Sequence, residues 1–70
     1  MMVTRGKDTT FYDDFPAEHL SRGSRVTMVT KRGPVTGVVE RVTETGLDLG
    51  DGGKYRPADV AELTIRGEVD

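Results

Sequence analysis

"RVTMVTKRGPVTGVVERV", residues 25–42, is the stretch that decides the fold of this chain. Its two ends, residues 25–30 and 35–42, are rich in β-branched side chains, and the first of them alternates in polarity with a period of two. Gly33 and Pro34 stand between the two ends, where they favour a turn. Because this pattern is typical of half-buried strands, the stretch predicts two antiparallel strands joined by a turn.

The second of these strands contains a glycine, Gly37, near its middle. Glycine within a strand usually marks a bulge, a sharp bend or a close approach between backbones. A bend at this point would let short strands curl around a common core. We place Val38 in the predicted core, but a bulge at Gly37 would exchange it with Val39, because successive side chains point to opposite faces.

Three further strands are predicted downstream, at residues 47–49, 54–56 and 61–67. "GDGG" (50–53) is a strong hairpin signal, and "PADV" (57–60) predicts a 3₁₀ turn before the last strand. Parallel strands would need crossover helices, for which the chain has no room. The five short strands therefore predict an all-β fold, a closed five-stranded antiparallel barrel. Its predicted core comprises Val26, Met28, Val38, Val42, Leu47, Leu49, Tyr55, Val60, Leu63 and Ile65.

The segments that flank the predicted strands are polar and less regular. Residues 1–10 lack periodicity and are predicted to form a flexible tail, as are residues 68–70. Pro16 favours the first turn of a short helix, which is predicted at residues 16–21. The domain is therefore expected to span residues 11–67, with this helix before its first strand.

Length and composition restrict what such a domain can contain. With 70 residues the chain is expected to form one domain, and its 34% apolar content is low. The absence of cysteine excludes disulfides, and one histidine, His19, cannot build a metal site alone, so no cofactor is expected. The sequence has neither an apolar run near the roughly 20 residues of a membrane span nor a secretion signal, which predicts a cytoplasmic protein.

A short helix, five strands and a 3₁₀ turn before the last strand together resemble the Sm-like fold, within the wider class of SH3-like barrels. Residues 25–42 are similar to the first segment of that family. "YRPADVAELTI" (55–65) is similar to the second, in which members carry an apolar residue, Arg, Gly and Asp or Asn. The resemblance covers residues 14–66 and implies a small barrel that binds RNA or protein.

RNA-binding members of this family grip a base with an Asp, an Asn and an Arg. Arg56 matches the Arg, but Pro57 stands where the second segment has Gly. Val42 falls at the position of the Asp, and Gly46 at that of the Asn. The resemblance therefore implies the fold without the usual RNA pocket. Other Sm-like proteins, the inhibitors of the Rho termination factor, bind protein, and "FYDDFPAEHL" (11–20) is similar to the segment before their first strand.

The sequence favours a non-enzymatic regulator or adaptor that binds a protein partner. An acidic and aromatic segment suits a basic partner, although the aromatic residues could instead cover one open end of the barrel. Pro57 lies where the fourth predicted strand ends and discourages pairing between subunits there, so a monomer or dimer is expected rather than a ring. The candidate partner-binding residues are Phe11, Tyr12, Asp13 and Asp14.

The alternative function is binding of RNA or DNA, because basic residues are concentrated in residues 21–41 and acidic ones in residues 42–70. In this alternative the cations contact phosphate groups. If the protein does not bind nucleic acid, the cations are solvated and Arg56 pairs with Asp59. No nucleophile accompanies His19, so no enzyme activity is expected. The candidate nucleic-acid-binding residues are Arg22, Arg25, Lys31, Arg32 and Arg56.

Overall fold

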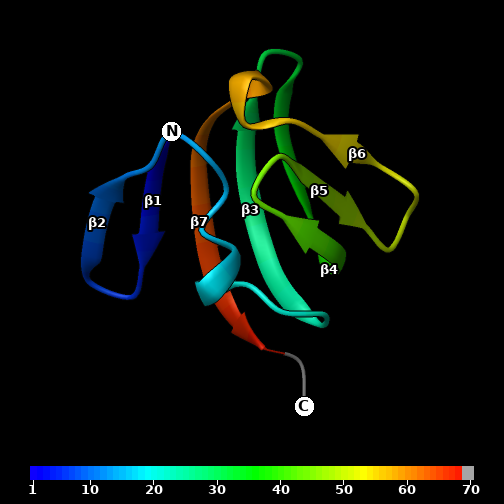
Figure 1. Cartoon of the computed structure of the whole chain (residues 1–70), viewed down its shortest axis with the longest axis horizontal. Coiled ribbons are helices and arrows are strands. Elements are labelled where there is room, and N and C mark those ends of the chain that lie inside the picture. Colours follow the sequence, from blue (N-terminus) through cyan, green and yellow to red (C-terminus); the bar gives the residue numbers. More distant parts are fainter. Residues whose placement is uncertain (69–70) are drawn as a thin grey trace.

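The computed structural model describes residues 1–68, with the side chains of residues 1–66. This part of the chain forms one mixed sheet of seven strands and two 3₁₀ turns, and it contains no α-helix, so the predicted all-β class is confirmed (Figure 1). Of the predicted tail at 68–70, Glu68 ends the last strand, and the other two residues lie outside the described residues. The elements are β1 (Met2–Arg5), β2 (Asp8–Phe11), η1 (Ala17–His19), β3 (Ser24–Thr30), β4 (Gly33–Thr43), β5 (Gly46–Leu49), β6 (Lys54–Tyr55), η2 (Pro57–Asp59) and β7 (Val60–Glu68).

The five strands that the sequence predicts correspond to β3 through β7, but the sheet is open. Its order is β2-β1-β7-β3-β4-β5-β6, so within residues 1–68 β2 and β6 are the two edges. A closed barrel would need β6 to pair with the free edge of β7. That edge is occupied by β1, in parallel register from Met2↔Glu62 to Arg5↔Ile65. The prediction of a closed, wholly antiparallel five-stranded barrel is therefore wrong.

The N-terminal residues form a hairpin, so the prediction of a flexible tail at residues 1–10 is wrong. β1 and β2 are antiparallel around a turn at Gly6, whose φ of 59° suits glycine. Val3 is 2% exposed and packs into the core where β1 joins β7. A strand of 4 residues with one buried side chain shows no periodicity in the sequence, because its place depends on the edge of β7.

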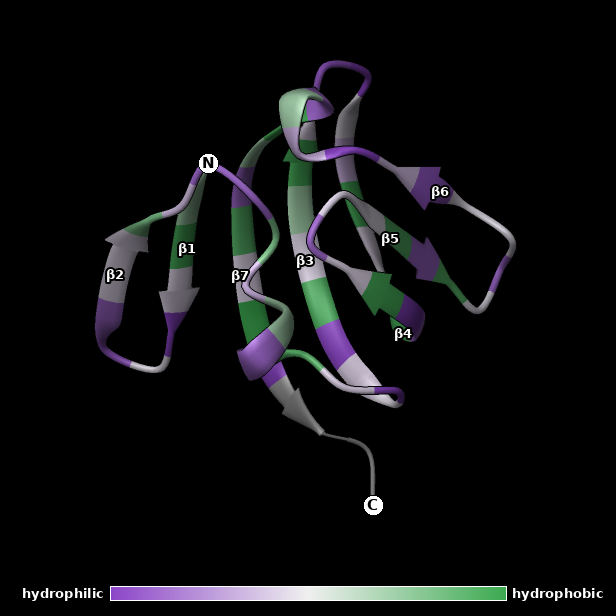
Figure 2. Cartoon of the chain, in the orientation of Figure 1, coloured by the Kyte–Doolittle hydropathy of each residue, from purple (hydrophilic) through white to green (hydrophobic). Residues whose placement is uncertain are grey.

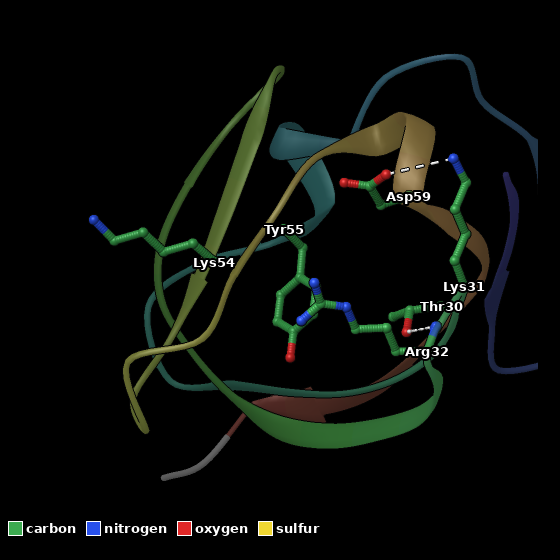
Figure 3. A pocket seen from close by; sticks show the side chains of 6 residues that line it. All are labelled: Thr30, Lys31, Arg32, Lys54, Tyr55 and Asp59. Atoms are coloured by element: carbon green, nitrogen blue, oxygen red, sulfur yellow. Dashed lines mark hydrogen bonds and ion pairs between the residues drawn. The ribbon is translucent and has the colours of Figure 1, made fainter.

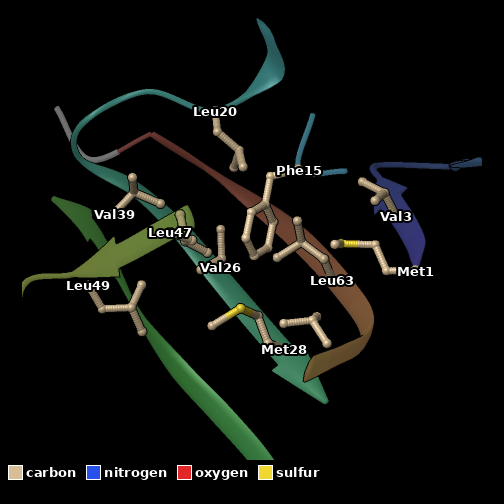
Figure 4. Close-up of a cluster of buried hydrophobic side chains, with 11 residues drawn as sticks. Met1, Val3, Phe15, Leu20, Val26, Met28, Val39, Leu47, Leu49 and Leu63 are labelled. Carbon is tan, nitrogen blue, oxygen red and sulfur yellow. The ribbon is translucent and has the colours of Figure 1, made fainter. Parts of the chain in front are cut away.

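The helix predicted at residues 16–21 is a single 3₁₀ turn, η1. The turn closes with the Leu20 N–H donating to Ala17 O (3.3 Å), and Leu20 itself is extended, with φ −117° and ψ 140°. Phe15 before the turn and Leu20 after it are 2% and 5% exposed, and both side chains point into the cluster of buried residues (Figure 4). Because the side chains of Phe15 and Leu20 must both reach the core, the chain between them has room for a single 3₁₀ turn only.

β4 is the longest strand and joins the two parts of the sheet. It pairs with β3 up to Val38 and with β5 from Val39 onward. A Cβ at Gly37 would stand 2.8 Å from Leu49 Cδ1, so this glycine makes room for a side chain and not for a second backbone. Gly37 lies opposite buried Val26, which turns Val39 inward and Val38 outward. Val39 is 1% exposed and Val38 40%, so the placement of Val38 in the core is wrong.

The remainder of the predicted core agrees with the structure. A single cluster of buried side chains lies between β1, β7, β3 and the strands β4 and β5 that cross them (Figures 1 and 4). Met1 and Val3, from the N-terminal segment, also belong to the cluster, although neither is in the predicted core. The predicted residues that are partly exposed but packed against the cluster are Val42, Tyr55 and Ile65. Those that are buried are Val26, Met28, Leu47, Leu49, Val60 and Leu63.

The outer face of the sheet carries a row of threonines, one from each of five adjacent strands. The strand register places each opposite its neighbour, and hydroxyl contacts of 3.2 and 3.4 Å join the two outermost pairs. Cross-strand pairs of this kind each contribute roughly 0.2–1 kcal/mol. The middle of this face is therefore uncharged, in contrast to the turn between β3 and β4, which is hydrophilic (Figure 2). From β2 to β4 the row is Thr9, Thr4, Thr64, Thr27 and Thr36.

The substitution Gly37→Val is expected to destabilise the domain by about 3 kcal/mol, although valine has the higher strand propensity. The added methyl groups would overlap Leu49, which is 2% exposed and therefore cannot swing into solvent. Urea unfolding followed by circular dichroism measures the change. The control is Thr36→Val on the neighbouring, exposed position, which should alter stability by less than about 0.5 kcal/mol. Equal stability of the two variants would contradict the close approach.

Candidate functional site

The segment between β2 and η1 forms, together with the turn between β4 and β5, a shallow acidic groove of about 410 Å³. Four carboxylates line it and no cation does. Like charges held this close raise the local negative potential and attract a cation more strongly than a single exposed carboxylate. The residues that line this acidic groove are Tyr12, Asp13, Asp14, Phe15, Pro16, Ala17, Glu18 and Glu44.

Backbone hydrogen bonds hold the acidic groove at two points. The Tyr12 N–H donates to Met1 O (2.9 Å), and the Phe15 N–H donates to Glu44 O (3.0 Å). The buried Phe15 ring then fixes the same point from inside the core. Asp13 and Asp14 stand between the two attachments with exposed side chains, so their carboxylates are presented on a backbone that is already ordered.

Three of the four predicted partner-binding residues meet in this groove, and the fourth does not. Tyr12, Asp13 and Asp14 line it, and the Tyr12 ring contacts His19 edge-on with centroids 6.4 Å apart. Phe11 belongs to β2, lies opposite Met2 and is 62% exposed. It is therefore separate from the groove, at the edge of the sheet. Glu44, which sequence reasoning missed, comes from another turn and gave no local signal.

The five predicted nucleic-acid-binding cations do not form one patch. Arg25 stands near the beginning of β3, and Arg22, which precedes that strand, pairs with Glu40 at 3.3 Å. Lys31 and Arg32 stand beyond the other end of β3. Because β3 separates these two groups along its length, the five cations do not share a single surface.

The structure instead brings Lys31 and Arg56 together at one carboxylate, that of Asp59. Asp59 Oδ1 lies 3.6 Å from Lys31 Nζ, and Asp59 Oδ2 lies 3.9 Å from Arg56 Nε. The predicted alternative role of Arg56, an ion pair with Asp59, is thus present, but the Arg56 side chain is 82% exposed. An ion pair that exposed contributes little to stability, so the guanidinium stays available to a ligand.

Lys31, Arg32 and Asp59 border a basic pocket of about 350 Å³ between the β3–β4 turn, β6 and η2 (Figure 3). Sequence reasoning did not single out Lys54, and it placed Tyr55 in the core while also considering that its ring could stack on a base. In "KYR" (54–56) two cations flank one aromatic residue, and in an extended segment the ring points to the face opposite the cations. The residues that line this basic pocket are Thr30, Lys31, Arg32, Lys54, Tyr55 and Asp59.

Hydrogen bonds fix the turn that forms one wall of the basic pocket. The Thr30 hydroxyl donates to Gly33 O (2.9 Å) and accepts from the Arg32 N–H (3.1 Å). The Lys31 N–H donates to Asp59 O (3.2 Å), which ties the turn to η2. The two cations of the turn are therefore carried by a backbone of defined shape, and only their long side chains are free to adjust.

The chain matches no protein-family profile, no curated protein and no solved structure. Within residues 1–68 there is no helix with the length and apolar content to cross a membrane. The same part of the chain contains no group of three or more His, Asp or Glu side chains that could hold a metal ion. Function is therefore inferred from the geometry and charge of the acidic groove and the basic pocket.

Proposed function

We propose that this protein is a non-enzymatic binding module whose acidic groove holds a lysine- or arginine-rich segment of a protein partner. The observation that carries the proposal is the convergence of four carboxylates on a backbone segment that is anchored at both ends. Ordering a flexible binding segment costs conformational entropy when it binds. This segment is already ordered in the folded protein, so binding does not incur that cost. The protein acts as a regulator or adaptor by occupying the partner's basic segment.

The charge balance within the groove supports a cationic partner. Asp13, Asp14 and Glu44 take part in no ion pair among the described residues, and Glu18 faces only His19, at 3.5 Å. Each exposed carboxylate alone attracts a partner cation by at most about 1 kcal/mol. Several of them acting on one lysine-rich segment give a specific and salt-sensitive attraction, and they repel acidic proteins.

A distant relation to the Sm-like or SH3-like class supports the same kind of function. In favour of it are the strand order β7-β3-β4-β5-β6 and the 3₁₀ turn η2 before β7. The RNA pocket of that family has no support, because Val42, at the position of its Asp, packs against the core. We further propose a monomer or dimer, since β6 has only 2 residues and Pro57 follows it closely.

Neutralising two carboxylates of the groove, in the variant Asp13→Asn/Asp14→Asn, is expected to weaken binding of a basic peptide about tenfold at low salt. The probe is a fluorescent peptide of alternating lysine and glycine, and binding is measured by fluorescence anisotropy. Both side chains are exposed, so the fold should be unaffected. Light scattering under the same conditions tests whether the protein is a monomer or dimer.

The matched control removes two negative charges elsewhere, in the variant Glu40→Gln/Glu62→Gln. Neither residue lines the acidic groove, so this variant should bind the peptide within about twofold of the unmodified protein. The proposal fails if the peptide does not bind at low salt. It also fails if the two double variants lose affinity equally, because the attraction would then come from net charge and not from the groove.

A further inference from the structure

We infer that the basic pocket binds the phosphate backbone of single-stranded nucleic acid, with one base lying against the Tyr55 ring. This is a second site, formed by other residues than the acidic groove. The side chains of Lys31 and Arg32 border the same 350 Å³ space as the Tyr55 ring, whereas the Lys54 side chain points away from them (Figure 3). Cations beside an exposed aromatic face are the combination by which proteins hold single strands without reading their sequence.

The charges around the pocket favour an anionic ligand. Lys31 and Arg56 both lie near the single carboxylate of Asp59, so two positive charges face one negative charge. Arg32 and Lys54 form no ion pair with any described residue. Three cations, Lys31, Arg32 and Arg56, therefore stand around the pocket with one carboxylate, although the whole chain has a net charge of −2. A ligand with closely spaced negative charges would neutralise them.

The Tyr55 ring is held in place by its surroundings, as a stacking surface must be. It packs partly against the core, and it belongs to β6, whose Tyr55 stands opposite buried Leu47. A Cβ at Gly53 would lie 3.0 Å from Tyr55 Cε2 and 3.1 Å from its hydroxyl oxygen, so one edge of the ring lies close beside this glycine. With one side supported in this way, the ring offers its pocket side to a base.

The position of Arg56 favours a polynucleotide over a free nucleotide. Its side chain is 82% exposed and it is not among the residues that line the pocket, yet it lies 3.9 Å from Asp59 at the pocket's border. A strand whose base enters the pocket continues past this border and places its next phosphate near Arg56. A duplex does not fit the site, because its bases are already stacked on each other and cannot lie on Tyr55.

Binding is tested with fluorescent single-stranded DNA and RNA of about 10 nucleotides, by anisotropy across a salt titration. The expected slope of log affinity against log salt is about −2, which corresponds to three phosphate contacts. The variant Arg32→Gln/Arg56→Gln should lose about tenfold in affinity, and its slope should become shallower by about 1.4. The variant Tyr55→Leu keeps an apolar side chain against the core, and its affinity should fall at least about fivefold because the stacking ring is lost.

The matched control is Arg22→Gln/Arg25→Gln, which removes two cations from the other end of β3. Its affinity for the oligonucleotides should stay within about twofold of that of the unmodified protein. Circular dichroism should show that every variant is folded. The inference is overturned if neither oligonucleotide binds at low salt, or if the control pair loses as much affinity as the pocket pair. Competition by uridine monophosphate or inorganic phosphate at the same concentration as the oligonucleotide would also overturn it, because the pocket would then belong to a small ligand.

Discussion

Replacing Leu63 by Ala is expected to lower the free energy of unfolding by about 2–5 kcal/mol, the largest loss for a single change in this domain. Leu63 lies in β7, between the partners Val3 in β1 and Met28 in β3, and it is fully buried. The substitution removes apolar contacts on both sides of the central strand and leaves a cavity that the surrounding strands cannot close. Urea unfolding monitored by circular dichroism measures the loss.

This loss is large relative to what a small domain possesses. At roughly 0.05–0.15 kcal/mol per residue, a chain of 70 residues has a total stability of only several kcal/mol. A Leu63→Ala protein that is largely unfolded without urea therefore agrees with the expectation. The control is Val38→Ala, at a side chain that is 40% exposed, and its cost should stay below about 1 kcal/mol. Similar stability of the two variants would mean that the core is not organised around β7.

Introducing lysine at Val3 is expected to destabilise the protein by about 3 kcal/mol, whereas lysine at the adjacent Met2 should be nearly neutral. Val3 is 2% exposed and points into the core, but Met2 is 41% exposed and lies opposite Glu62, a favourable neighbour for a cation. The two substitutions introduce the same side chain one residue apart, so they differ only in the face of β1 that receives it.

This pair of variants separates the two accounts of the N-terminus. If residues 1–10 were a flexible tail, both lysines would be solvated and both proteins would keep their stability. If β1 lies on the edge of β7, the Val3→Lys protein must bury an ammonium group or release the strand, and either costs free energy. Amide hydrogen exchange adds an independent measure, since release of β1 would expose the backbone of β7 on that side.

The central strands were predictable because their information is local. Residues 25–30 carry the alternation that specifies β3, residues 35–42 carry the β-branched side chains of β4, and Gly33 and Pro34 mark the turn between them. Val38 and Val39 could not be assigned in the same way. Their orientation depends on which residues face β3, and a one-residue change of register exchanges the two side chains.

The candidate sites were predictable only in part, for the same reason. Tyr12, Asp13 and Asp14 are adjacent in the sequence, so their common place in the acidic groove followed from local reading. Tyr55 and Arg32 are far apart in the chain and meet in the basic pocket because η2 carries β6 against the β3–β4 turn. No local pattern in the sequence predicts that these two residues lie close together.

The sequence alone determined that this chain is a small all-β domain, which turns connect its later strands, and which side chains make most of its core. These properties depend on backbone propensity and on a period of two, which neighbouring residues express. Tertiary structure alone decided that the sheet is open and that β1 occupies the edge of β7. It also decided which charges share a site. The physical reason is that strand pairing and charge clustering join distant residues, whose energies arise only when the chain has folded.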